Sequence, residues 1–266
     1  MDKLEKYFLH REETDKALNR YRDFAETSSW CVGGPYGKLQ LYDLAKTAFD
    51  GSTPSDTAFL AFQAMYETVR RWPSVQRGGG GALAPSDEVF SVLTDNENKP
   101  LREPSLHLAN FTIRSSAADR VESILPSLKF IKRSRSYPWM PVSKILHFVN
   151  PTLFPIWDWG VVWYQVMWRE TGVGDAPFRR EYESFCNDND LTATENGARF
   201  LCNYCAWGAR YIQLGGSPFM GWFADWISQN FSDDIVKYNM DQRINTLYAT
   251  AFEFVAIGAA YLEGGR

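Results

Sequence analysis

Residues 129–158 read KFIKRSRSYPWMPVSKILHFVNPTLFPIWD. The last of them, Asp158, is the first carboxylate of the chain after Glu122. The basic residues of the stretch are Lys129, Lys132, Arg133, Arg135 and Lys144. In a chain of net charge −4, this local excess of positive charge indicates a place built for an anion. Aromatic residues stand between the charges, and such rings stack on bases while basic side chains neutralise phosphates.

The second half of the stretch predicts a helix followed by an irregular connection. Residues 141–149 have helical spacing, with apolar side chains at Val142, Ile145, Leu146 and Val149. Asn150-Pro151 should end this helix, because the residue before a proline disfavours the helical conformation. Residues 151–157 are then an apolar connection, and we expect a further helix at about residues 160–170.

Helical periodicity extends over most of the remaining chain. We expect helices at about residues 2–26, 38–50, 54–72, 117–125, 196–214, 218–231 and 242–262, and short helical segments from Ser86 onward. No stretch alternates polar and apolar residues for long enough to predict a strand. The sequence therefore predicts a mainly α fold.

Composition is that of an ordinary globular protein. A chain of 266 residues, 45% of them hydrophobic, can bury a substantial core in one large domain or two modest ones. The charged N-terminus leads into no apolar segment typical of a secretory signal, and no apolar run is long enough to span a bilayer, so we expect a cytoplasmic protein without membrane contact. The chain has ten tryptophans, and most of its aromatic rings are expected in the core.

The cysteines predict neither a disulfide framework nor a metal site. Cys31, Cys186, Cys202 and Cys205 are few for this length and are expected as reduced thiols. Cys202 and Cys205 have metal-like spacing, but structural zinc sites require four closely grouped ligands. We therefore interpret these two cysteines as small residues on one helix face, and we expect no metal and no cofactor.

The order of helix, turn, helix with an early lysine, connection, aspartate and helix resembles the helix-hairpin-helix DNA glycosylases. Met140-Pro-Val-Ser-Lys144 would occupy the turn and lysine positions, and Phe154-Pro-Ile-Trp-Asp158-Trp-Gly-Val-Val would occupy the aspartate segment. The resemblance covers only this short part of the chain. Unlike the usual family turn, this one contains Pro138 and Pro141 and no glycine, and Lys144 stands closer to Asp158 in sequence than is usual.

The resemblance implies a helix-hairpin-helix glycosylase-like fold with two closely packed helical subdomains. Within one compact unit, residues 1–266, the hairpin and the catalytic aspartate would belong to residues 111–214. Residues 1–110 together with 215–266 would form the second helical subdomain. The implied protein is a monomeric enzyme whose partner is DNA.

The implied reaction is base excision. Cleavage of an N-glycosidic bond develops positive charge on the sugar, which the carboxylate of Asp158 would stabilise while it orients the attacking water. Lys144 would instead attack C1′ and form a Schiff base if the enzyme also has an AP-lyase step. The residues expected to contact DNA are Lys132, Arg133, Arg135, Tyr137, Val142 and Ser143. A flipped base needs flat apolar surfaces, and the candidates for its pocket are Trp157, Trp159, Trp139 and, more remotely, Trp30.

Each of these residues also has a purely structural interpretation. Asp158 could cap the helix that follows it, Lys144 could be a solvated helix residue, and one of Trp157 and Trp159 could belong to the core. The basic residues at 132, 133 and 135 could form a solvated loop. His147 is expected to be a hydrogen-bonded core histidine rather than a catalytic base.

The leading hypothesis is thus a DNA glycosylase that flips and excises a modified base and leaves an abasic site. The many aromatic residues would suit a bulky base, such as a hypermodified cytosine of viral DNA removed in antiviral defence. The alternative is a non-catalytic helical module that binds nucleic acid or a protein. A hydrolase built on Asp233-Asp234 is a weaker alternative, because adjacent aspartates also suit a helix N-terminus.

Overall fold

The computed structural model describes residues 4–27, 34–72, 83–103, 105–112, 116–125, 139–156, 193–237 and 244–264. These residues are mainly helical and contain no strand, which confirms the predicted mainly α class. The helices are α1 (Lys6–Leu9), α2 (Arg11–Thr27), α3 (Gly34–Phe49), α4 (Ser55–Arg70), α6 (Ser86–Thr94), α7 (Ser116–Ile124), α8 (Trp139–Val149), α11 (Ala193–Asn230), α12 (Ser232–Lys237) and α13 (Tyr248–Gly264), with short 3-10 helices η2 (Lys99–Leu101) and η5 (Ile244–Thr246). None of these described helices is long and apolar enough to cross a membrane.

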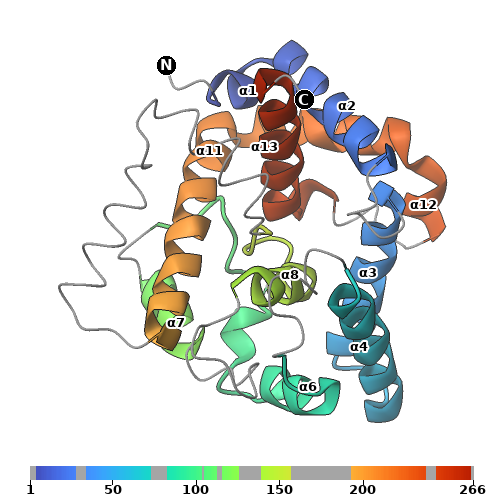
Figure 1. The fold of residues 1–266 in the computed structure, drawn as a ribbon, viewed down its shortest axis with the longest axis vertical. Helices are drawn as coiled ribbons and strands as arrows, with labels where there is room; N and C mark the ends of the chain where they lie inside the picture. The colour runs from blue at the N-terminus through green and yellow to red at the C-terminus, as the bar shows by residue number, and fades with distance from the viewer. Residues whose placement is uncertain are drawn as a thin grey trace.

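Helix α8 occupies the middle of the molecule (Figure 1). It packs against α3, α4 and α11, while α13 packs along α2. In Figure 1, α13 and the connection that follows α8 meet near the centre, with α11 on one side and α3 and α4 on the other. Segments far apart in sequence therefore surround the helix on which the sequence analysis centred.

Residues 141–149 of helix α8 are buried on every side. Its apolar positions Val142, Ile145 and Leu146 are fully buried, as the helical spacing predicts. The structure adds that every residue from 141 to 156 is buried, including the polar residues between the apolar ones. The helix ends at Val149, directly before Asn150-Pro151, as expected.

Helix α11 contains the break that the sequence predicts between two helices. Gly216 has φ 57° and ψ −153°, a conformation that glycine adopts far more readily than other residues. Pro218 follows, and it can donate no backbone hydrogen bond to the preceding turn. The predicted helices at 196–214 and 218–231 are thus two arms of one kinked element, which packs against η5 and α13.

The first predicted helix, at residues 2–26, is in fact two helices. The chain breaks at His10, whose backbone is extended with φ −128° and ψ 119°. The side chain of Thr14, fully buried, donates a hydrogen bond of 2.7 Å to the carbonyl oxygen of Tyr7. This bond satisfies a carbonyl that the break would otherwise leave unpaired, and apolar periodicity does not reveal such a bond.

Aromatic rings fill the core, as expected from composition. Phe8 packs against Tyr211 and Phe219, with ring centroids 5.2 Å and 4.8 Å away. Phe252 from α13 joins the same group, 6.1 Å from Phe8. Helices α1, α11 and α13 therefore share one apolar interior.

Candidate functional site

Most of the residues predicted to act on DNA lie outside the described residues. These are Trp30, Lys132, Arg133, Arg135, Tyr137, Trp157, Asp158 and Trp159, and the side chain of Trp139 is not described either. The predicted helix at residues 160–170 also falls outside the described ranges. Of the predicted site, the structure describes the side chains of Val142, Ser143 and Lys144, and the connection that leads towards Asp158.

The expected turn at residues 140–144 is wrong. Helix α8 already begins at Trp139, so these residues are helical and no hairpin turn precedes Lys144 at this point. Pro141 fits the first turn of a helix, because the backbone N–H that proline lacks would have no partner there. The side chains of Val142 and Ser143 are fully buried, so neither reaches a DNA partner in this conformation.

Lys144 is not the solvated helix residue that one interpretation expected. Its side chain is 2% exposed, and it lies on α8 three residues before His147, on the same helix face. A buried ammonium group is costly unless polar or charged groups surround it. Its burial therefore directs attention to the polar interior around α8.

His147 confirms the expectation of a hydrogen-bonded core histidine. Its ring is fully buried, and Nδ1 lies 2.7 Å from the carbonyl oxygen of Phe154. A carbonyl only accepts, so Nδ1 carries a proton, and in the neutral ring Nε2 accepts from the hydroxyl of Tyr42 at 2.6 Å. The Tyr42 oxygen in turn lies 2.9 Å from Oγ1 of Thr250.

A buried carboxylate lies beside this chain of hydrogen bonds. Oε2 of Glu253 is 3.6 Å from Nε2 of His147, and Glu253 is 2% exposed. The set of Tyr42, His147, Thr250 and Glu253, here called the buried polar cluster, joins α3, α8 and α13. Sequence reasoning missed its members from α3 and α13. One signal could have found Glu253, because it is the only charged residue between Arg243 and Glu263.

The connection at residues 150–156 is buried throughout and is fixed by hydrogen bonds from several elements. Asn150 and Thr152 donate side-chain hydrogen bonds to the carbonyl oxygens of Glu103 and Leu106, at 3.2 Å and 3.0 Å. The hydroxyl of Tyr204 on α11 donates to the carbonyl oxygen of Ile156 at 3.0 Å. Buried irregular backbone requires such partners, and here they come from residues 103–106 and from α11.

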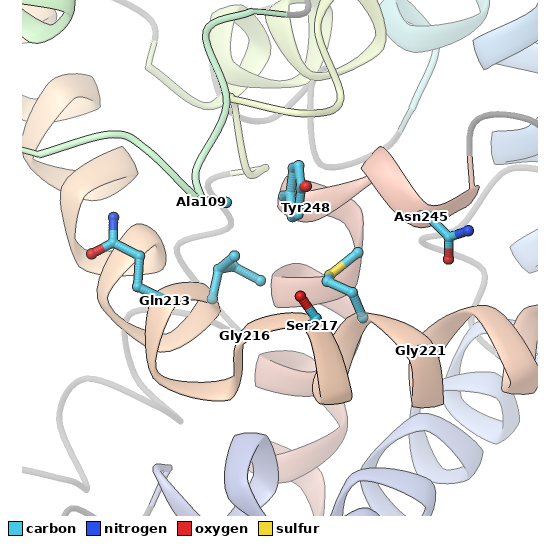
Figure 2. A pocket seen from close by; sticks show the side chains of 9 residues that line it. Ala109, Gln213, Gly216, Ser217, Gly221, Asn245 and Tyr248 are labelled. Carbon is cyan, nitrogen blue, oxygen red and sulfur yellow. The ribbon is translucent and has the colours of Figure 1, made fainter.

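Two backbone hydrogen bonds link the connection to a neighbouring pocket. The N–H of Leu108 donates to Thr152 O at 2.9 Å, and that of Ala249 donates to Pro151 O at 3.1 Å. Ala109 and Tyr248 line a pocket of about 450 Å³ (Figure 2). They are the sequence neighbours of Leu108 and Ala249. The other described lining residues are Ile212, Gln213, Gly216, Ser217, Met220, Gly221 and Asn245.

Figure 2 shows how the kink at Gly216 shapes this pocket. Gln213 stands on the arm of α11 before the kink and Ser217 and Gly221 on the arm after it, while Tyr248 closes the opposite side. The Gln213 amide is held in place, because Nε2 donates to the carbonyl oxygens of Leu108 and Phe111 at 3.3 Å and 3.0 Å. The ring of Tyr248 is backed by His107, with centroids 5.0 Å apart.

The cysteines within the described residues are structural. Cys202 and Cys205 are free thiols, buried on helix α11, as the interpretation of two small residues on one helix face predicted. Burial raises the pKa of the Cys205 thiol, which keeps it protonated and unreactive. Within the described ranges, no three histidine, cysteine or acidic residues are grouped so as to hold a metal ion.

The described residues thus bring together three features around the end of α8. The buried polar cluster is joined to the connection at 150–156 through Phe154 O, and the pocket at the α11 kink adjoins it through Thr152 O and Pro151 O. The described part of the connection ends at Ile156, two residues before Asp158 in the sequence. A cluster of acid–base groups beside a concave pocket is typical of functional sites. No family model, curated protein or solved structure matches this chain.

Proposed function

We propose that this chain is a DNA glycosylase that flips a modified base out of the duplex and cleaves its N-glycosidic bond. One observation carries the proposal: the connection before Asp158 is irregular, completely buried and hydrogen-bonded to Glu103, Leu106 and Tyr204. Irregular backbone of this kind is expensive to bury unless its polar groups are paired, so the fold invests several hydrogen bonds in the segment that ends at Ile156. The sequence that follows supplies a lone carboxylate between two tryptophans.

Asp158 acts on the sugar in this mechanism. As the bond between C1′ and the base nitrogen breaks, its electron pair leaves with the base and positive charge develops on the sugar ring. The carboxylate stabilises that charge and orients a water molecule, which adds to C1′ and gives up a proton. The products are the free base, protonated at the departing nitrogen, and an abasic site.

The DNA contacts come from the segment before α8. Lys132, Arg133, Arg135 and Tyr137 lie against the phosphate backbone, and the flipped base is received among Trp157, Trp159 and Trp139, with Trp30 as a remoter candidate. Val142 and Ser143 are not part of this surface as side-chain contacts, because both are buried. These aromatic residues suit a bulky modified base, such as a hypermodified cytosine in viral DNA. An enzyme that removes such a base would be a cytoplasmic, monomeric defence enzyme.

The experiment that tests this function measures the release of bases. The purified chain is incubated with modified and unmodified DNAs, including phage genomes, and the released bases are identified by mass spectrometry. Abasic sites are scored as alkali-labile breaks. The Asp158→Asn variant keeps the size and the capping ability of the residue and loses its charge, so we expect base release to be abolished while the fold and DNA binding persist.

Two outcomes would contradict the proposal. Near-wild-type excision by Asp158→Asn would remove this carboxylate from the mechanism. DNA binding without release of any base from the full panel would favour the alternative, a non-catalytic helical module that binds nucleic acid.

A further inference from the structure

The pocket at the α11 kink has the size and the lining of a small-molecule site. Its volume of about 450 Å³ lies within the range of known ligand pockets. Ile212 and Met220 give it apolar surface, and Tyr248 gives it an aromatic ring. In Figure 2 the Ser217 hydroxyl points to the side of the pocket where Tyr248 lies, so a bound molecule would meet apolar and polar atoms at once.

The described lining residues carry no formal charge. Their polar side chains are the amides of Gln213 and Asn245 and the hydroxyls of Ser217 and Tyr248. A site for a phosphate or carboxylate would place arginine or lysine around the ligand. Neutral amides and hydroxyls instead suit a neutral ligand that both donates and accepts hydrogen bonds.

Two of these groups can discriminate between ligands. Gln213 is not one of them, because its Nε2 is engaged with Leu108 O and Phe111 O and its amide points away from Tyr248 in Figure 2. Asn245 is exposed and offers both a donor and an acceptor, the pair that reads the edge of a heterocyclic base. The Tyr248 ring, backed by His107, provides a surface on which a planar ring can stack.

We propose that this pocket binds a neutral nucleobase, stacked on Tyr248 and hydrogen-bonded at its edge by Asn245. This inference goes beyond the proposed function, because a free base can bind whether or not the chain cleaves DNA. The pocket adjoins the connection at 150–156 through the Leu108–Thr152 and Ala249–Pro151 hydrogen bonds. A role for this pocket in holding the base after its release from the tryptophans rests on the proposed glycosylase activity, whereas binding of a free base does not.

The test uses the full chain and free bases as probes. Saturation-transfer NMR is recorded with adenine, cytosine and 5-hydroxymethylcytosine at millimolar concentration, and dissociation constants are obtained by titration. Orotate, a pyrimidine that carries a carboxylate, serves as the charged comparison. We expect at least one neutral base to bind and orotate to bind at least about tenfold more weakly, because burying an unpaired charge is costly.

Variants locate the site. Tyr248→Leu removes the stacking surface and Asn245→Ala removes the edge contact, and each should weaken binding at least about fivefold. Tyr248→Phe keeps the ring and should retain binding. It keeps the test of the stacking surface usable if the Tyr248→Leu variant fails to fold. Gln229→Ala is the matched control, because Gln229 lines a different groove, beside Arg11 and Trp226, and should bind as the wild type does.

Absence of binding by all three bases, equal binding of orotate, or binding unaffected by Asn245→Ala and Tyr248→Leu would each overturn the proposal. The base-release assay reads the proposed function separately. Binding of a free base without base excision supports the nucleobase site and refutes the glycosylase activity. Base excision without binding of a free base supports the glycosylase activity and refutes the nucleobase site.

Discussion

Lys144 and Glu253 are the buried charged side chains of the described chain, each 2% exposed. An ion removed from water costs several kcal/mol unless neighbouring groups compensate, so two such residues near the end of one central helix require a reason. His147, on the same helix as Lys144, lies 3.6 Å from the Glu253 carboxylate on α13 and is hydrogen-bonded to Tyr42 and to Phe154 O. Sequence patterns assign charged residues to the surface, and for this reason they identified His147 as core but left Lys144 as a solvated alternative.

The first prediction concerns Tyr42 and His147. Tyr42→Phe removes a hydroxyl that serves both His147 and Thr250, so we expect the free energy of unfolding to fall by about 1–3 kcal/mol. His147→Gln should be at least as destabilising, because it also affects the bond to Phe154 O. Denaturant unfolding of both single variants and the double variant checks this. We expect a coupling of about 0.5–3 kcal/mol, and strictly additive losses would contradict the network.

The second prediction concerns Lys144 as a nucleophile. A Schiff base forms only when the amine reaches C1′ of the sugar, and near-attack geometry is demanding. The side chain of Lys144 is buried, so we expect borohydride to trap no covalent adduct between the wild-type enzyme and DNA. Lys144→Ala is the control. An adduct that forms with the wild type and disappears in Lys144→Ala would show that the lysine becomes accessible and that the enzyme has a lyase step.

At the scale of elements, the sequence predicted the ends of those helices at which a proline or a glycine stands. Proline after Asn150 ends α8, and Gly216 with Pro218 divides α11, as expected from their backbone chemistry. The break at His10 and the helical start of α8 at Trp139 were missed, because a side-chain hydrogen bond and tertiary packing decide them. The expected hairpin turn failed for the same reason: Pro141 is compatible with a turn and with a first helical turn alike.

The third prediction concerns Gly216 in the kink. An added Cβ would meet only Pro218 Cδ at 3.7 Å, so a clash is absent, and the penalty of Gly216→Ala is the strain of its positive φ. We expect a loss of about 1–3 kcal/mol in unfolding free energy. Gly221→Ala is the matched control on the same helix, with nothing within 4 Å of the added atom, and it should stabilise by about 0.5–1 kcal/mol. Equal effects at the two positions in thermal or denaturant unfolding would contradict the role of the kink.

At the scale of the whole molecule, the first helices of the described chain, α1 and α2, pack against its last helix, α13. Lys6 and the hydroxyl of Tyr7 both bind Glu263, at 2.7 Å and 2.8 Å. A Cβ at Gly258 would lie 1.8 Å from the carbonyl oxygen of Ala17, so only glycine allows α13 to approach α2 this closely. Burial, followed by the bond to Glu263, raises the pKa of Tyr7 to about 12. These contacts join positions that periodicity treats independently, so the sequence predicted both helices but not their pairing.

The same limit applies to the candidate site. The buried polar cluster takes Tyr42 from the first third of the chain, His147 from the middle and Glu253 from the end. His147 belongs to the expected subdomain of residues 111–214. Tyr42 and Glu253 belong to the other expected subdomain, residues 1–110 together with 215–266. A motif confined to residues 129–158 could therefore identify α8 and His147, whereas the groups that surround them came only from the fold.

The last prediction concerns the charge of the whole chain. A protein of net charge −4 is repelled by DNA at long range, so it binds phosphates only where its cations are concentrated. Residues 129–144 hold five basic residues without an acid, and we expect K132A/R133A/R135A to weaken binding to all DNA sequences alike. Each lost phosphate contact should reduce the slope of log affinity against log salt by about 0.9, which gives a reduction of up to about 3 for the triple variant.

Fluorescence anisotropy over a series of salt concentrations measures this slope. The matched control is K46A/K99A/R120A, which removes the same number of charges from α3, η2 and α7 and should leave the slope nearly unchanged. Both variants have the same net charge, so a difference between them reports position and not total charge. If the two variants shift the slope equally, the basic stretch does not lie on the phosphates, and general electrostatics would account for the binding.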